Sequence, residues 1–193
     1  MSDQSLTADF FDQLYQADPD PWGFETSDYE AAKYAATLAA LPRPHYRSAF
    51  EIGGSIGVLT ERLAPRCGAL LSVDISAIAQ ARARQRCQHL PQVQLQLMTV
   101  PQEYPSTRFD LVLLSEVGYY WCWADLRQAL QKIYQSLLPG GQLLLVHWLH
   151  EAPSYPLGGD EVHDAFQAFA ESRLIHLSGQ RTADYRLDLY ERP

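Results

Sequence analysis

The fold is decided by Ala49-Phe50-Glu51-Ile52-Gly53-Gly54-Ser55-Ile56-Gly57, with Val73-Asp74 about twenty residues further along the chain. This pattern predicts a buried strand, a glycine-rich turn, the start of a helix, and a second strand that ends in an acid. Glycines let a backbone turn tightly and approach a ligand closely, and the second acid can accept hydrogen bonds from a ribose diol. The arrangement is therefore typical of a nucleoside-cofactor site.

The spacing of the glycines distinguishes between cofactors. A pyrophosphate-binding turn has the spacing G-x-G-x-x-G, whereas this chain has Gly53, Gly54 and Gly57. The acid Glu51 would repel a pyrophosphate but suits a ligand that carries an ammonium group. We therefore expect S-adenosylmethionine rather than a dinucleotide. The cofactor-binding residues expected in this region are Glu51, Gly53, Gly54, Ser55, Gly57, Asp74 and Ile75.

Strands and helices alternate along most of the chain. Sequence patterns predict strands at 49–52, 69–73, 93–98, 109–114 and 143–148, and helices at 28–41, 58–63, 76–90, 124–138 and 160–173. Residues 1–18 are also expected to be helical, although this segment is polar. Ser27 has the pattern of an N-cap, with Glu30 completing a capping box. The alternation predicts a doubly wound, mostly parallel sheet in an α/β fold, and strands at 174–177 and 185–190 would add an antiparallel edge.

Length and composition bound the class of protein. The chain has 193 residues, a net charge of -8 and a pI near 5.1, which predicts one domain and argues against a nucleic-acid partner. Arg82, Arg84 and Arg86 are interpreted as the solvated face of a helix. No apolar run reaches about 18 residues and the N-terminus is not basic, so neither a membrane span nor a secretion signal is expected.

The three cysteines, Cys67, Cys87 and Cys122, lack metal-type spacing. They are expected to be free thiols in a reducing compartment, which places the protein in the cytoplasm. His147, His150 and His163 are an alternative set of metal ligands, but no metal is expected.

Two polar-aromatic segments follow the predicted central strands. Ser115-Glu116-Val117-Gly118-Tyr119-Tyr120 comes after one strand and His147-Trp148 closes the next. Glu116 could bind an acceptor ammonium or remove its proton, His147 is a usable base, and Tyr119 could shield the reacting methyl. The alternatives are a loop salt bridge, a hydrogen-bonded histidine and a packed aromatic loop. The predicted catalytic residues are Glu116, His147 and Tyr119, and Ser115 is expected at the floor of the cofactor site.

These motifs together resemble the class I S-adenosylmethionine-dependent methyltransferases, and more closely the nodulation-protein-S-like subgroup. The matching pieces span roughly residues 10–165 and include Asp20-Pro21-Trp22-Gly23, Glu51-Ile52-Gly53, Val73-Asp74, Glu116-Val117-Gly118-Tyr119-Tyr120, Leu138-Pro139-Gly140-Gly141 and His147-Trp148. Such proteins normally have an acid for the adenine amine after the third strand. Here that acid is missing near Thr99, and Thr99 or the backbone of Val100 would serve instead, unless the segment only packs as a loop.

The resemblance implies a Rossmann-like, seven-stranded sheet whose last strand is antiparallel. It implies that the glycine turn holds the methionine part of the cofactor. It also implies one methyltransferase domain over 1–193, in which residues 1–45 form a helical lid carrying Tyr15 and Trp22, and residues 46–193 form the core. The namesake enzyme methylates the nitrogen of a deacetylated amino sugar in a chitooligosaccharide.

The function expected from the sequence is methyl transfer from S-adenosylmethionine to a small-molecule acceptor, at an amine nitrogen. The product of the cofactor would be S-adenosylhomocysteine. Two alternatives stay open, a small-molecule O-methyltransferase and a non-catalytic module that binds the cofactor. The glycine spacing disfavours a third, a nicotinamide oxidoreductase. The sequence identifies neither the acceptor nor the oligomeric state.

Overall fold

The structure, a computed structural model, describes residues 4–193, which fall into two compact units. The N-terminal unit comprises Thr7–Met98. The C-terminal unit comprises Thr99–Pro193 together with the segment that ends at Leu6. The first three residues of the helix predicted at 1–18 lie outside the described residues.

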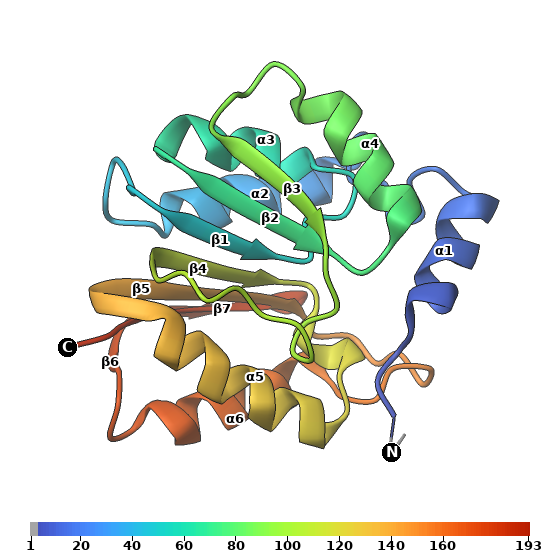
Figure 1. The fold of residues 1–193 in the computed structure, drawn as a ribbon. Helices are drawn as coiled ribbons and strands as arrows, with labels where there is room; N and C mark the ends of the chain where they lie inside the picture. The colour runs from blue at the N-terminus through green and yellow to red at the C-terminus, as the bar shows by residue number, and fades with distance from the viewer. Residues whose placement is uncertain (1–3) are drawn as a thin grey trace. The chain divides into compact units, whose positions relative to one another are not determined.

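The N-terminal unit contains the glycine turn and three parallel strands. These are β1 (Ala49–Ile52), β2 (Leu70–Asp74) and β3 (Val93–Leu97), in the order β3-β2-β1. Helix α3 (Val58–Leu63) and a short 3-10 helix, η1 (Ala64–Arg66), follow β1, and α4 (Ala77–Cys87) follows β2 and packs against β2 and β3 (Figure 1). All four residues of β1 are buried, as its apolar pattern predicts.

Two helices precede these strands in the same unit. Helix α1 (Ala8–Ala17) packs beside α4, and α2 (Asp28–Ala39) follows the turn-rich break (Figure 1). The Ser27 hydroxyl accepts a hydrogen bond from the N–H of Glu30 at 3.4 Å, which confirms the predicted N-cap of α2. The Glu30 carboxylate pairs with the Lys33 ammonium at 2.9 Å.

The C-terminal unit contains four strands in the order β4-β5-β7-β6. They are β4 (Phe109–Ser115), β5 (Leu137–Trp148), β6 (Ile175–Arg181) and β7 (Tyr185–Glu191). β4 and β5 are parallel, whereas β7 is antiparallel to both β5 and β6, so the antiparallel last strand is confirmed. Helices α5 (Trp123–Ser136) and α6 (Gly159–Ala170) pack together, and the 3-10 helix η2 (Gly118–Tyr120) follows β4 (Figure 1).

Seven strands, with helices between β1 and β2, between β2 and β3, and between β4 and β5, confirm the predicted doubly wound α/β fold. Two strand boundaries were predicted wrongly, the end of β6 and the start of β5. Strand β6 continues to Arg181, beyond the predicted end at residue 177. The segment Pro139-Gly140-Gly141 was expected to separate α5 from the next strand, but β5 begins directly after α5, at Leu137. The pairing with β4 shifts from Phe109↔Leu137 to Leu111↔Gln142, and Gly140 has a φ of 73°. The glycines therefore form a bulge inside the strand.

Candidate active site

The glycine turn after β1 forms the first group of candidate residues. Gly53 and Gly57 have φ angles of 82° and 84°, a region that glycine adopts readily and other residues rarely. Gly54 approaches β2 so closely that a Cβ there would lie 2.0 Å from the Ser72 hydroxyl oxygen. A Cβ on Gly57 would meet Ala83 at 3.1 Å, so this glycine also lets α3 start close to α4. Backbone conformation and close packing together explain the glycine-rich motif.

Asp74 ends β2 and braces this turn. Its two carboxylate oxygens accept hydrogen bonds from the backbone N–H groups of Ser55 and Ser76, both at 2.8 Å. Burial raises the pKa of Asp74 to about 6, although both hydrogen bonds act in the opposite direction. Asp74 and the next residue, Ile75, are partly exposed. Each carboxylate oxygen has a further lone pair, so Asp74 can also accept hydrogen bonds from ligand hydroxyls.

Glu51 lies under the same turn and is only 1% exposed. Its Oε2 accepts a hydrogen bond from the Thr60 hydroxyl at 2.5 Å, and its Oε1 has no hydrogen-bond partner among residues 4–193. Burial raises the pKa of this carboxyl. A buried acceptor that lacks a donor costs free energy. The Glu51 side chain therefore suits a ligand that brings a donor such as an ammonium group.

The N-terminal helix α1 is attached to the glycine turn. The Tyr15 hydroxyl shares a hydrogen bond with the Ser55 hydroxyl, and the Ser76 hydroxyl donates to Asp12. Tyr15 is buried, and the Trp22 ring packs edge-on against its ring at 5.6 Å between centroids. Ser55 has a φ of 50°, in the region that favours glycine. Its hydroxyl explains why a serine occupies this position, since the side chain anchors the segment predicted to be a lid.

The segment expected to face the adenine opens the C-terminal unit. The Thr99 N–H donates to the Glu103 carboxylate at 2.7 Å, and the Glu103 N–H donates to the Thr99 carbonyl at 2.8 Å. Val100 is buried, whereas Thr99 is partly exposed. The carboxylate of Glu103 therefore lies beside Thr99, near the position where the sequence lacks the acid that normally binds the adenine amine.

The second group of candidate residues lies where β4 and β5 end, in the C-terminal unit. Ser115 is buried at the end of β4, and Glu116 has a φ of 59°. Glu116 Oε2 accepts hydrogen bonds from the Tyr119 hydroxyl at 2.5 Å and from the Trp148 N–H at 2.9 Å. The structure therefore brings Glu116 and Tyr119 together, as a catalytic pair requires.

Tyr119 is the centre of an aromatic cluster. Its ring stacks on Tyr155 at 5.3 Å between centroids, and Tyr120 packs edge-on against it at 4.7 Å. Burial raises the pKa of Tyr119 well above its usual value, so its hydroxyl stays protonated and donates to Glu116. The sequence did not indicate Tyr155, which comes from the segment between β5 and α6.

His147 is fully buried in β5. Its Nε2 accepts a hydrogen bond from the Gly118 N–H at 3.0 Å, and its Nδ1 lies 3.1 Å from Nε2 of His163. A backbone N–H can only donate, so the Nε2 lone pair is already in use. These bonds favour a positioning role for His147 over the expected role as a base. A Cβ on Gly118 would lie 2.9 Å from this Nε2, so the approach needs glycine.

The three histidines weighed as metal ligands do not converge. His147 and His163 contact each other, whereas Nε2 of His150 lies 2.8 Å from Asp184. Across residues 4–193, no group of three or more His, Cys, Asp or Glu residues is arranged to hold a metal ion. None of the helices in the described part of the chain is both long and apolar enough to cross a membrane.

Residues 7–152 match the sequence profile of the Nodulation protein S (NodS) family. The chain belongs to the NodS family. NodS relatives include the proteins of Rhizobium tropici and Sinorhizobium fredii, which are 32% and 31% identical to it over 127 residues, or 65% of this chain. Those residues span 53% and 59% of the two relatives, so the chain covers little more than half of their length.

Solved structures confirm the class I methyltransferase fold. The N-methyltransferase NodS of Bradyrhizobium japonicum WM9, solved in complex with S-adenosylhomocysteine, matches with a TM-score of 0.83 at 24% identity, over 94% of this chain and 96% of that one. A candidate methyltransferase from Pseudomonas syringae is 38% identical, with a TM-score of 0.74, over 85% of this chain and 99% of that one. The predicted resemblance to the NodS-like subgroup is therefore confirmed.

Proposed function

We propose that this chain is an S-adenosylmethionine-dependent methyltransferase that acts on an amine nitrogen of a small molecule, amino sugars included. One observation carries the proposal: the braced glycine turn lies over a buried Glu51 oxygen that has no donor among the described residues. That arrangement fits a ligand with both an ammonium group and ribose hydroxyls. Membership of the NodS family supports the same reading.

Each expected residue has a place in this proposal. The glycine turn and Glu51 would hold the amino-acid part of the cofactor, and Asp74 with Ile75 would hold the ribose. Thr99, Val100 and Ser115 would line the remainder of the cofactor site. Residues 1–45, with Tyr15 and Trp22, would cover the cofactor as a lid within one functional domain over 1–193.

When bound, S-adenosylmethionine supplies a methyl group on a sulfonium that is already a good leaving group. The chain's residues must align the acceptor and remove its proton. We assign proton removal to Glu116, because an acceptor ammonium must lose a proton before its nitrogen can attack. The Tyr119 hydroxyl and the Trp148 N–H hold the Glu116 carboxylate in one orientation. His147 fixes Gly118, and with it the loop that carries both residues.

The cytoplasm remains the proposed location, since Cys67, Cys87 and Cys122 are all free and buried.

Calorimetry with S-adenosylmethionine, S-adenosylhomocysteine and NAD tests cofactor choice. We expect the first two to bind and NAD not to bind. Asp74→Ala should weaken binding by about ten- to several hundred-fold, through loss of one or two charge-assisted hydrogen bonds. Asp28→Ala, an exposed carboxylate in the first turn of α2, is the matched control. Unchanged affinity in Asp74→Ala would refute the ribose assignment.

A second experiment tests transfer. The protein is incubated with donor labelled on its methyl group and with panels of amines, amino sugars and alcohols, and products are identified by mass spectrometry. Label on nitrogen supports the proposal. Label on oxygen would instead identify an O-methyltransferase, and binding without transfer would point to a regulatory module.

A further inference from the structure

A chain of hydrogen-bonded side chains runs through the C-terminal unit, from the loop after β4 to the surface strand β6. The Gly118 N–H donates to His147 Nε2 at 3.0 Å, and His147 Nδ1 lies 3.1 Å from His163 Nε2. His163 Nδ1 lies 2.7 Å from Asp188 Oδ2, and His176 Nε2 lies 2.8 Å from Asp188 Oδ1. These contacts form one continuous path that joins five elements of the unit, namely η2, β5, α6, β7 and β6.

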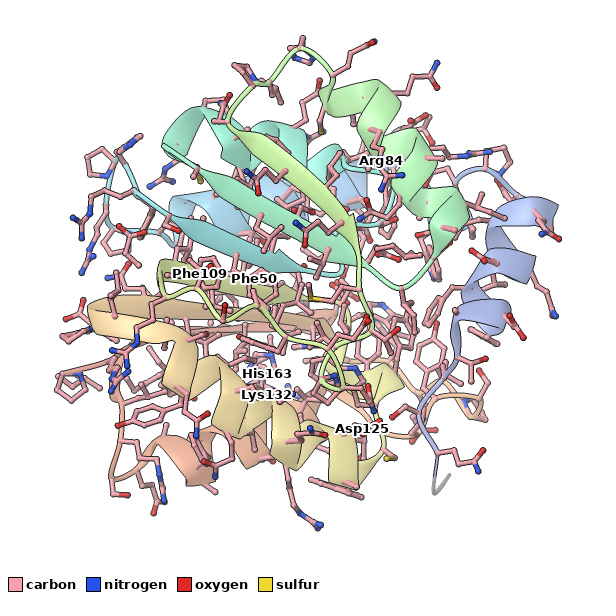
Figure 2. The ribbon with its side chains drawn as sticks, viewed as in Figure 1. Phe50, Arg84, Phe109, Asp125, Lys132 and His163 are labelled. Carbon is pink, nitrogen blue, oxygen red and sulfur yellow. The ribbon has the colours of Figure 1, made fainter. Side chains whose placement is uncertain are left out.

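The inner part of this hydrogen-bonded path is shielded from water. His147 and His163 are 0% exposed and Asp188 is 5% exposed, and Figure 2 shows His163 in the interior of the C-terminal unit. The Arg186 guanidinium donates to Asp188 Oδ2 at 2.8 Å and supplies a positive charge next to this carboxylate. Although burial opposes it, hydrogen bonds from His163 and His176 hold the pKa of Asp188 below its usual range.

At the surface end of this hydrogen-bonded path, two irregularities of strand β6 bring His176 close to Asp188. The pairing of β6 with β7 shifts between His176 and Ser178, and such a bulge re-aims a side chain. Gly179 faces Asp188 so closely that a Cβ there would lie 2.5 Å from Oδ1. These two departures from a regular strand leave space for the carboxylate and its histidine partner.

The positions of the ring protons follow from the groups at the two ends of the histidine pair, the Gly118 N–H and the Asp188 carboxylate. The Gly118 N–H must donate, so His147 Nε2 carries no proton and Nδ1 carries one. That proton is donated to His163 Nε2, which leaves the proton of His163 on Nδ1, facing the acceptor Asp188. Both rings are therefore neutral and both have the Nδ1–H form. A third proton on this pair would bring two donors face to face, either at Gly118 or between the rings.

We infer that His163 and Asp188 are positioning residues for the proposed methyl transfer, since they fix the tautomer through which His147 holds the Gly118–Tyr119 loop. The inference rests on the proposed function for its kinetic part. Glu116 and Tyr119 bond to each other on the same loop. If the Gly118 anchor is lost, Glu116 no longer meets the acceptor in a fixed geometry, although the donor-binding turn is untouched.

Nuclear magnetic resonance of the full chain tests the tautomers without reference to activity. Long-range proton–nitrogen spectra of the uniformly nitrogen-15-labelled protein distinguish the Nδ1–H, Nε2–H and doubly protonated forms of the six histidines. Single histidine variants assign the signals. We expect His147 and His163 both as neutral Nδ1–H rings at neutral pH. An Nε2–H form of His147 would overturn the inference, whether or not any acceptor is ever methylated.

Kinetics on three variants test the positioning role. His163→Phe keeps a ring but removes both nitrogens, and should lower kcat by about tenfold or more while donor affinity stays within about twofold. His163→Gln should recover part of that loss, because its amide oxygen can accept from His147. His89→Gln, an exposed histidine of the N-terminal unit, is the control and should match the wild type.

A kcat of His163→Phe within about twofold of the wild type would overturn the positioning role. So would an equal loss of kcat and donor affinity, which would indicate general destabilisation. If His163→Phe does not fold, His163→Gln and the wild-type spectra still decide. A wild type that transfers no methyl to any acceptor would contradict the proposed function instead, and the spectra would still test the hydrogen-bonded chain.

Discussion

The glycine turn of the N-terminal unit differs in its polar contacts from the strand-end cluster of the C-terminal unit, which consists of Glu116, Tyr119, His147 and His163. In the turn, backbone N–H groups bond to Asp74, while a buried Glu51 oxygen has no donor among the described residues. In the cluster, side chains bond mainly to one another, as in the Glu116–Tyr119 pair and the His147–His163 pair.

This difference separates a binding site from a catalytic framework. A buried hydrogen-bond acceptor without a partner costs free energy. A ligand that brings a hydrogen-bond donor removes this cost, so the site favours a bound ligand. Short hydrogen bonds between side chains instead hold those side chains in one geometry, which is what alignment of a reacting group requires. Substitutions in the turn should therefore change the affinity for S-adenosylmethionine, and substitutions in the cluster should change the turnover rate.

The largest effect is expected at Gly53. Gly53→Val should abolish donor binding in a protein that still folds, because a β-branched residue is strained at a φ of 82° and would occupy space beside the ligand. Thermal shift with and without the donor measures this.

The control is the same substitution at Gly158, where φ is -94° and the nearest atom to an added Cβ is 3.6 Å away. Gly158→Val should keep the wild-type shift. A wild-type shift in Gly53→Val as well would show that this turn is not the donor site.

The next effect concerns Glu116. Glu116→Gln keeps the size of the side chain and an acceptor for the Trp148 N–H, but an amide cannot take up a proton. Turnover should fall by at least about tenfold with donor affinity nearly unchanged, as measured by single-turnover kinetics and calorimetry. Glu171→Gln, on the exposed end of α6, is the control. If Glu116→Gln turns over within about twofold of the wild type, catalysis rests on alignment alone.

Much of the fold could be predicted from local patterns. Strand β1 and helix α3 were predicted with their observed bounds, because a buried apolar run, two glycines and a helical repeat are all contiguous in sequence. The start of β5 was missed since the same Pro-Gly-Gly signal marks both a turn and a bulge. Only the pairing with β4 distinguishes them, and pairing is a non-local property.

The site was predictable only where its residues follow strand ends. Asp74 and Glu116 were identified because the carboxyl ends of parallel strands bind ligands in this architecture. Tyr155 and Asp188 were missed since they come from a loop and an edge strand with no motif. Their roles depend on side chains from other elements.

The arginines of α4 give one correction. Arg82 donates to the Pro19 carbonyl at 2.6 Å, and Arg86 donates to the Ile56 carbonyl at 3.0 Å and pairs with Glu25. These two side chains are therefore not simply solvated, as the sequence suggested. They attach the segment after α1 to α4, because a long arginine side chain can reach backbone carbonyls across the helix surface.

A smaller effect is expected at the anchor of the lid. Tyr15→Phe keeps the ring against Trp22 but removes the hydroxyl bonded to Ser55. Loss of one buried hydrogen bond, worth about 1 kcal/mol, should weaken donor binding by about fivefold and speed hydrogen exchange over Ala8–Ala17. Tyr104→Phe removes a similar bond to Ser136 and serves as control. Equal exchange in Tyr15→Phe and the wild type would argue against the anchor.

The smallest effect is a pH dependence that only the turn should show. Burial raises the pKa of Asp74 from 3.8 to about 6, so the folded protein binds this proton at a higher pH than the unfolded chain does. The Asp74 contribution to stability is therefore lost as pH rises from about 4 to about 6. Donor affinity should change the other way, because only the ionised carboxylate makes charge-assisted bonds to ribose hydroxyls.

Between about pH 7.5 and about pH 5.5 the ionised fraction of Asp74 falls about fourfold, and donor affinity should fall by up to the same factor. Calorimetry at several pH values measures this, with Asp74→Asn as the matched variant. Asp74→Asn should bind more weakly at neutral pH and lose this pH dependence, because its amide does not titrate. A wild-type affinity that is constant over this range would mean that ionised Asp74 does not contact the donor. The Asp74 carboxylate would then resemble the His147–His163 pair, whose polar groups position other parts of the protein.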